Sequence, residues 1–357
     1  MTPTRHLQQV RDLRIARTAP LTAPEDVLRE LPLTDDQAEV VLRGRSQIGA
    51  IIDRADDRLL VVVGPCSVHD VEAAREYAGL LSARAAELGD DLCVAMRVYF
   101  EKPRTTTGWT GMITDPHLDG SGDVNTGVRM ARGLLLDVLA LGLPVAVEWL
   151  DPVTPQYISD TVAWGAIGAR TAESQTHRQL GSGLSMPVGF KNRTDGNVQV
   201  AVDAVRAAAV SHAFAGVDLS GHPAILHTTG NRDCHIILRG GRGAPNYGAA
   251  HVADALAKLR AAALPERLVI DASHDNSRKD HERQPVAAAD VAGQVAGGNG
   301  AIVGLMLESF LVAGRQDHDD GAPLRYGQSI TDACMDWDTT SEVLEQLATA
   351  VRARRHG

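Results

Sequence analysis

A cluster of cations and hydroxyl groups follows one short apolar run of the sequence. The run covers residues 92–96, and Arg97, Lys102, Arg104 and Thr105 come soon after it. A strand cannot keep three unpaired cations on its buried face, so we expect it to end near Arg97 and the cations to lie on the following loop. A guanidinium beside hydroxyl groups suits a phosphate, although a solvated basic loop is the alternative for this stretch alone.

A second group of residues has the chemistry of metal ligands. Cys66, His274, Glu308 and Asp332 offer a thiolate, an imidazole and two carboxylates, which suit Mn, Fe, Co or Zn more than Mg or Ca. Their wide spacing alone is a weak signal, because free cysteine is usually a small buried core residue and His274 could be a loop histidine. The group is stronger because three of the four follow an expected strand.

The elements that must position these residues form a repeating pattern from Leu59 onward. Short apolar runs alternate with segments of helical period, which is typical of βα units in a parallel sheet. The eight expected strands cover residues 59–63, 92–97, 144–148, 167–170, 187–191, 236–239, 268–272 and 301–307. Eight such units predict an α/β fold of the (β/α)₈ TIM barrel type, with residues 57–357 as one catalytic domain.

Every expected strand end carries an ionisable side chain. The residues at or just after the ends are Cys66, Arg97 with Lys102, Glu148, Arg170, Lys191, Arg239, His274 and Glu308. Because the reactive face of such a barrel lies at these ends, the cations predict a substrate with more than one anionic group. Glu148 stands among the cations, where it could position a water molecule or only balance charge.

Three segments lie outside the repeating pattern. Residues 1–56 are expected to form an N-terminal extension, with a helix over 34–53 capped by Thr34. Residues 212–229 are expected to form a β-hairpin inserted before the sixth strand. Residues 341–354 are expected to form a last helix.

Composition excludes several classes of partner. The formal net charge is −10, which argues against nucleic acid, and no long apolar run precedes Leu60, which argues against a signal peptide or a membrane partner. The four cysteines are scattered without a CxxC spacing, so we expect a reducing, cytoplasmic location.

Several motifs are long enough to indicate a family. They are Gly-Pro-Cys-Ser at 64–67, Arg-Val-Tyr-Phe-Glu-Lys-Pro-Arg-Thr-Thr at 97–106, Trp-Gly-Ala-Ile-Gly-Ala-Arg-Thr at 164–171, Pro-Val-Gly-Phe-Lys-Asn at 187–192, His-Ile-Ile-Leu-Arg-Gly-Gly at 235–241 and Ser-Ile-Thr-Asp-Ala-Cys at 329–334. From about residue 12 to 354 the chain resembles the type I 3-deoxy-D-arabino-heptulosonate-7-phosphate (DAHP) synthases, in particular the branch found in enteric bacteria. The resemblance implies a transferase that condenses phosphoenolpyruvate with erythrose 4-phosphate, giving DAHP and phosphate at the first step of the shikimate pathway to the aromatic amino acids.

The resemblance also implies roles for particular residues. Those expected to hold phosphoenolpyruvate are Arg97, Lys102, Arg170, Lys191 and Arg239. Those expected to hold the aldose phosphate are Arg104 and Thr105. The implied ligands of a divalent metal ion are Cys66, His274, Glu308 and Asp332. The catalytic candidates are Lys102, as proton donor to the aldehyde oxygen, Glu148 and His274. A homodimer or homotetramer that uses the N-terminal extension is also implied.

Four positions depart from what the family usually has. They are Thr110 in place of lysine, Arg193 in place of glycine, Ala272 in place of phenylalanine and Asp275 in place of a small residue. These departures keep open a specialised-metabolism paralogue that condenses phosphoenolpyruvate with another aldehyde. A non-catalytic regulatory barrel is less compatible with four intact metal ligands, and an octulosonate-phosphate synthase has different motifs at 102–106.

Feedback control is expected near the extension and the inserted hairpin, as in related enzymes. The corresponding region of this chain includes Asp12, Ser185, Phe214 and Gly216. Gly216 lacks the polar side chain expected of phenylalanine-sensitive relatives. We therefore predict weak or altered inhibition by phenylalanine.

Overall fold

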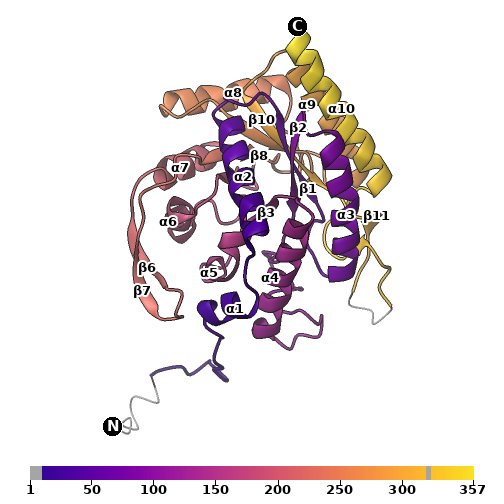
Figure 1. Cartoon of the computed structure of the whole chain (residues 1–357). Coiled ribbons are helices and arrows are strands. Elements are labelled where there is room, and N and C mark those ends of the chain that lie inside the picture. The colour runs from indigo at the N-terminus through magenta and orange to yellow at the C-terminus, as the bar shows by residue number, and fades with distance from the viewer. Residues whose placement is uncertain (1–9, 319–322) are drawn as a thin grey trace.

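Eight parallel strands close into a barrel in the computed structural model, which describes residues 10–318 and 323–357 (Figure 1). The order around the barrel is β1-β10-β9-β8-β5-β4-β3-β2. The strand bounds are β1 Leu59–Gly64, β2 Leu92–Arg97, β3 Val145–Trp149, β4 Trp164–Ile167, β5 Val188–Lys191, β8 His235–Leu238, β9 Leu268–Asp271 and β10 Ile302–Glu308. The predicted TIM barrel is confirmed.

Helices surround this barrel on the outside (Figure 1). Their bounds are α1 Pro24–Glu30, α2 Asp35–Ile52, α3 Val71–Glu87, α4 Val124–Ala140, α5 Pro155–Ile158, α6 Gln175–Gly183, α7 Gln199–Ala208, α8 Ala249–Ala261, α9 Gln284–Ala296 and α10 Trp337–His356, with 3₁₀ turns η2 at Ser159–Thr161 and η3 at His281–Arg283. The α2 helix begins as the sequence predicts, because Thr34 and Gln37 form a reciprocal capping box. Among the described residues no helix has the length and apolar character needed to cross a membrane.

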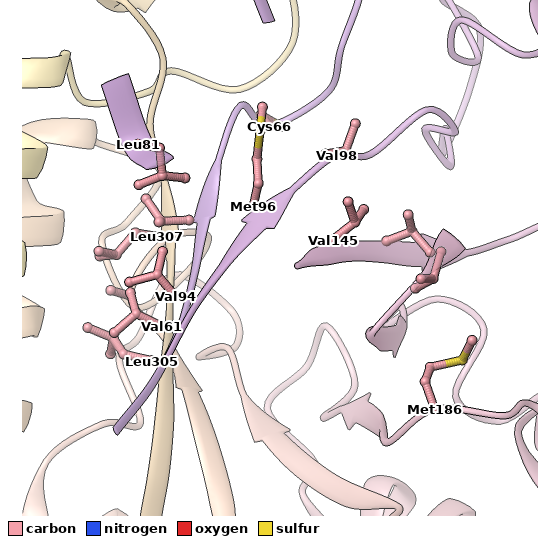
Figure 2. Packing of buried hydrophobic residues seen from close by; sticks show 14 of the residues in the cluster. Val61, Cys66, Leu81, Val94, Met96, Val98, Val145, Met186, Leu305 and Leu307 are labelled. Atoms are coloured by element: carbon pink, nitrogen blue, oxygen red, sulfur yellow. The ribbon is translucent and has the colours of Figure 1, made fainter. Parts of the chain in front are cut away.

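The barrel strands are buried on both faces, which explains their continuous apolar runs. One set of side chains, including Val61, Val94, Leu305 and Leu307, belongs to the larger core cluster and gathers beside neighbouring strands (Figure 2). A second buried cluster combines barrel residues with three isoleucines of α2, Ile48, Ile51 and Ile52. The α2 helix therefore packs against the barrel as part of its core.

The strand bounds agree with the prediction to within one or two residues, except at the fourth strand. We predicted residues 167–170, whereas β4 covers Trp164–Ile167, so Arg170 lies on the loop after the strand. Glycine at 165 weakened the strand signal, yet the position requires it: a Cβ there would lie 2.4 Å from the indole nitrogen of Trp149. The last helix is also longer than predicted, because it begins at Trp337.

The predicted hairpin is confirmed as an antiparallel pair, β6 (Ala213–Val217) and β7 (Pro223–His227). It stands to one side of the barrel (Figure 1), and Gly221 has a φ of +79° in its turn. A further pair, β11 (Val312–Arg315) and β12 (Gln328–Ser329), was not predicted. It brings the segment before Asp332 back toward the end of β10.

Candidate active site

A cavity of about 670 Å³ lies at the carboxyl ends of the barrel strands. All the residues predicted to bind substrate line it, namely Arg97, Lys102, Arg104, Thr105, Arg170, Lys191 and Arg239. Glu148, His274 and Asp332 line it as well. The structure therefore brings together side chains that come from distant parts of the sequence.

Three of the four predicted metal ligands form one cluster beside this cavity. Ligand atoms of Cys66, Glu308 and Asp332 all lie within 4.8 Å of one another. The strand register explains the approach: Gly64 of β1 is opposite Glu308 of β10, and Cys66 follows two residues later. The ammonium of Lys102 donates to the sulfur of Cys66 at 2.7 Å and to Asp332 at 2.9 Å.

His274 lies next to the cluster, and contacts to its Nδ1 hold the ring in place. Its Nδ1 lies 2.9 Å from Asp271 and 2.7 Å from the hydroxyl of Ser273, while its Nε2 is 3.8 Å from Glu308. A carboxylate that orients a histidine through one nitrogen leaves the other nitrogen available to a metal ion. The backbone of His274 has a φ of +55°, an uncommon conformation for a residue other than glycine.

The donor set fits a divalent transition metal ion. Burial raises the pKa of the Cys66 thiol to about 12, and the nearby Glu308 carboxylate adds to the shift. Lys102 lowers the pKa of Asp332 well below its usual range. Two carboxylates and a buried thiol in one place favour a cation that stabilises their charged forms, and the mixture of sulfur, nitrogen and oxygen donors is typical of transition metals.

Arg97 is a buried residue of the cavity lining and makes fixed contacts. Its Nη2 donates to Glu308 at 2.9 Å and to the carbonyl of Cys66 at 3.1 Å, and its Nε donates to the carbonyl of Pro65. The guanidinium carbon stacks 3.7 Å from the ring centroid of Tyr99. Its Nη1 is buried and has no hydrogen-bond partner among the described residues. One donor of Arg97 is therefore unpaired, although the residue lines the cavity.

Lys191 lies between two buried carboxylates. Its ammonium is 3.2 Å from Glu148 and 3.4 Å from Asp271. Burial opposes the ionisation of Glu148, but Lys191, Arg97 and Lys102 together lower its pKa, so the carboxylate is charged. A Cβ on Gly168 would lie 2.8 Å from Glu148, so this glycine allows the loop after β4 to pass over the carboxylate.

Arg239, at the end of β8, is paired with Asp275 through its Nη1. Its backbone nitrogen donates to Asn192, and its side-chain Nε is buried without a partner among the described residues. The outer cations, Arg104 and Arg170, contact backbone carbonyls: Arg104 donates to the carbonyl of Trp109 at 2.8 Å, and Arg170 lies 3.5 Å from the carbonyl of Pro103. The inner cations are thus held by carboxylates and the outer ones by loop carbonyls.

Of the four residues that depart from the family pattern, one lines the cavity. Asp275 lines it, whereas Thr110 contacts the hydroxyl of Thr114 away from it. Arg193 forms ion pairs with Glu173 and Asp195 outside the lining. Ala272 is fully buried in the core. An exchange of charge around the cavity between Thr110 and Arg193 has no support in these contacts, since neither residue lines it.

Several lining residues were not singled out by the sequence analysis. Tyr99 and Glu101 follow Arg97 within an apolar segment and were read as part of the motif only. Asp271 ends β9 and contacts both Lys191 and His274, although it does not line the cavity. The position of Asp271 at the end of β9 is the sequence signal that could have identified it, as it identified His274.

A separate cavity of about 460 Å³ lies between the hairpin and α6. Ser185 and Phe214, two of the residues predicted for effector binding, line it. Gly216 does not: a Cβ there would lie 2.5 Å from the end of the Leu226 side chain, which lines the cavity. Asp12 is not part of the lining either.

Comparisons with known proteins find similar sequences and a similar solved structure. Residues 31–345 match the family model described as "DAHP synthetase I family". The Phe-sensitive phospho-2-dehydro-3-deoxyheptonate aldolase of Escherichia coli K12 is 55% identical over 96% of this chain and 98% of its own length. A phospho-2-dehydro-3-deoxyheptonate aldolase of Corynebacterium glutamicum is 53% identical over 96% of this chain and 94% of its own length. A solved structure of the Francisella tularensis aldolase superposes with a TM-score of 0.94 at 50% identity, covering 96% of this chain and 99% of the other.

Proposed function

Since the chain belongs to the DAHP synthetase I family, we propose that it condenses phosphoenolpyruvate with erythrose 4-phosphate to give DAHP and phosphate. This is the first step of the shikimate pathway. The observation that carries the proposal is the ring of cations around one cavity, beside a cluster of thiol and carboxylate ligands. Neither a different aldehyde nor a non-catalytic role is favoured by the comparisons.

In this proposal the inner cations hold phosphoenolpyruvate. Arg97, Lys191 and Arg239 are buried and fixed, so they present charge without further reorganisation to the carboxylate and phosphate. Arg170 and Lys102 complete the set. Arg104 and Thr105 lie toward the exposed side of the same cavity and suit the phosphate of the aldose.

Cys66, His274, Glu308 and Asp332 would hold the divalent metal ion, which we propose to be Mn, Fe, Co or Zn. When bound, the ion would polarise the aldehyde oxygen as a Lewis acid. The unused Nε2 of His274 and the clustered donors of the other three support this assignment.

The protein groups account for the proton transfers. The C3 carbon of phosphoenolpyruvate attacks the aldehyde carbon, and Lys102 donates a proton to the oxygen that becomes negative. Burial opposes the charge of Lys102, but Cys66 and Asp332 raise its pKa, so it carries that proton. The charged Glu148 positions the water that adds at C2, or it balances the charge of Lys191. The bond between C2 and the phosphate oxygen then breaks, and the two protons of the water go to Lys102, which regains its charge, and to the leaving phosphate.

Phosphate release tests the proposal. Metal would be removed with a chelator, and phosphoenolpyruvate would be supplied with erythrose 4-phosphate or with a panel of other aldehydes, with and without Mn²⁺. We expect metal-dependent release with erythrose 4-phosphate as the preferred aldehyde. Preference for another aldehyde would overturn the substrate assignment, and no release with metal present would overturn the enzymatic assignment.

We also propose that residues 1–56 act as an extension of the 57–357 barrel in a cytoplasmic homodimer or homotetramer. The extension is tied to the barrel by Gln37, which donates to the carbonyl of Leu136, and by Arg45, which donates to the carbonyls of Ser159 and Val162. All four cysteines are free, which suits a reducing compartment. Light scattering on the full chain and on a chain lacking residues 1–30 would measure the contribution of the extension.

A further inference from the structure

Tyr99 belongs both to the lining of the substrate cavity and to the buried core of the barrel. Its ring belongs to the buried cluster inside the barrel, with neighbours such as Ala95 and Ala146, and yet the residue also lines the charged cavity. Only 3% of its surface is exposed. Tyr99 is therefore the boundary between the apolar interior of the barrel and the site above it.

The hydroxyl of Tyr99 is buried and has no hydrogen-bond partner among the described residues. An unpaired buried hydroxyl is unfavourable, and phenylalanine would fill the same space without that cost. Burial also raises the pKa of Tyr99 well above its ordinary value, so the hydroxyl keeps its proton and can donate. The group is thus a donor that lacks an acceptor in the protein.

Two cations flank the same ring. The guanidinium carbon of Arg97 lies 3.7 Å from its centroid and the ammonium of Lys191 lies 5.7 Å from it. Both cations are assigned to phosphoenolpyruvate above, and Arg97 has a second unpaired donor, Nη1, in the same wall. Arg97, Lys191 and Tyr99 line the same cavity, so an anion held by both cations would lie beside the Tyr99 side chain.

We infer that the Tyr99 hydroxyl donates a hydrogen bond to an anionic oxygen of bound phosphoenolpyruvate, while the ring holds the Arg97 guanidinium in place. This inference rests on the proposed function, because it takes phosphoenolpyruvate as the ligand between Arg97 and Lys191. The other groups proposed to bind phosphoenolpyruvate are cations. A neutral hydroxyl can donate a further hydrogen bond to the ligand without repelling the cations beside it.

Tyr99→Phe tests the hydroxyl alone, because the ring and its stacking on Arg97 are kept. Binding of phosphoenolpyruvate to the Mn²⁺-loaded full chain would be measured by calorimetry, together with KM and kcat. We expect the dissociation constant to rise roughly tenfold or more, as for the loss of one hydrogen bond to a charged group. The Mn²⁺ affinity should be unchanged, and the melting temperature of the ligand-free protein should be equal or higher, because the unpaired buried hydroxyl is removed. Tyr99→Leu also removes the ring and should weaken binding further.

Tyr77→Phe is the matched control. Tyr77 is equally buried, but its hydroxyl donates to Ser309 at 3.0 Å away from the cavity, so its loss should lower stability and leave phosphoenolpyruvate binding unchanged. If Tyr99→Phe binds phosphoenolpyruvate as tightly as the unmodified protein, the inference is wrong while the proposed function stands. If the unmodified protein itself does not bind phosphoenolpyruvate, the proposed function fails first.

Discussion

The ammonium of Lys102 lies 2.7 Å from the sulfur of Cys66. The same ammonium is 2.9 Å from Asp332, so one cation spans two of the proposed metal ligands. A cation in this position neutralises the ligand cluster and stands beside the place where an aldehyde oxygen would gain charge. Substitution of Lys102 is for this reason the most direct test of the proposed acid catalysis.

Replacing Lys102 with methionine should lower kcat by roughly 100-fold or more, the usual contribution of a general acid. The side chain keeps a similar length but loses its proton and its charge. Steady-state phosphate release would give the value. Lys258→Met is the control, because Lys258 pairs with Asp254 on the surface of α8 and should have no effect. Equal activity of the two variants would contradict the assigned role.

Removal of the proposed ligands should abolish stabilisation by metal. At 100 times its dissociation constant, Mn²⁺ should raise the free energy of unfolding by about 2.7 kcal/mol through preferential binding to the folded chain. Thermal unfolding with and without Mn²⁺ would show the effect, which we expect to vanish in Cys66→Ser and Asp332→Asn. The control is Asp338→Asn on the exposed side of α10, which should respond to Mn²⁺ as the unmodified protein does.

Asp275→Asn should tighten the binding of phosphoenolpyruvate. Asp275 lines the cavity, pairs with Arg239 and repels an incoming anion, so the neutral amide should lower KM for phosphoenolpyruvate, roughly three- to tenfold. Asp195→Asn is matched to it, since Asp195 pairs with Arg193 outside the cavity lining. A raised KM in Asp275→Asn would instead mean that the carboxylate serves to orient Arg239.

The buried carboxyl group of Glu101 should make the free energy of unfolding decrease as the pH rises. Burial raises its pKa to about 8, and the nearby Asp151 carboxylate adds to the shift. When the pKa of a carboxyl group is higher in the folded state than in the unfolded state, the group contributes its full stabilisation of the fold at a pH below the unfolded pKa. This contribution to the free energy of unfolding is lost as the pH rises toward the folded pKa of about 8. The melting temperature of Glu101→Gln minus that of the unmodified protein should therefore increase between about pH 4.5 and 8. A constant difference over that range would show that Glu101 is ionised in the folded protein.

Phenylalanine should inhibit this enzyme weakly or in an altered way. The cavity beside the hairpin contains Ser185 and Phe214, but Leu226 occupies the space that a side chain at position 216 would take. Titration of phenylalanine, tyrosine and tryptophan into the phosphate-release assay would give the order of inhibition. Strong inhibition by low phenylalanine concentrations would show that the absence of a polar group at Gly216 has no effect.

The sequence predicted the barrel and the ring of ionisable residues because both follow local patterns. Apolar runs mark strands buried on two faces, and charges at their ends stop those runs, as at Arg97 and Lys191. The partners of these charges were not predictable in the same way. Arg97 contacts Glu308 across β1, and this pairing depends on the closure of the barrel, which no local pattern contains.

Tyr99 was missed for a related reason. In the sequence it follows Arg97 among apolar residues, where an aromatic side chain is ordinarily part of the core, and it does belong to a core cluster. Tyr99 differs from an ordinary core residue because it also lines the cavity and its buried hydroxyl has no partner among the described residues. Asp275 was noticed as a departure, but its pairing with Arg239 became visible only when the loop after β9 was placed beside the end of β8.

The hairpin formed by β6 and β7 lies between two strands that pair directly with each other. Lys191 of β5 is opposite Ile237 of β8, so the barrel ladder closes without any hydrogen bond from the hairpin. Its length and composition can therefore change without altering the shear of the barrel or the spacing of the cations. The hairpin is in effect an exchangeable module: transplanting it between relatives would change the lining of the cavity beside α6 while keeping the ring of cations.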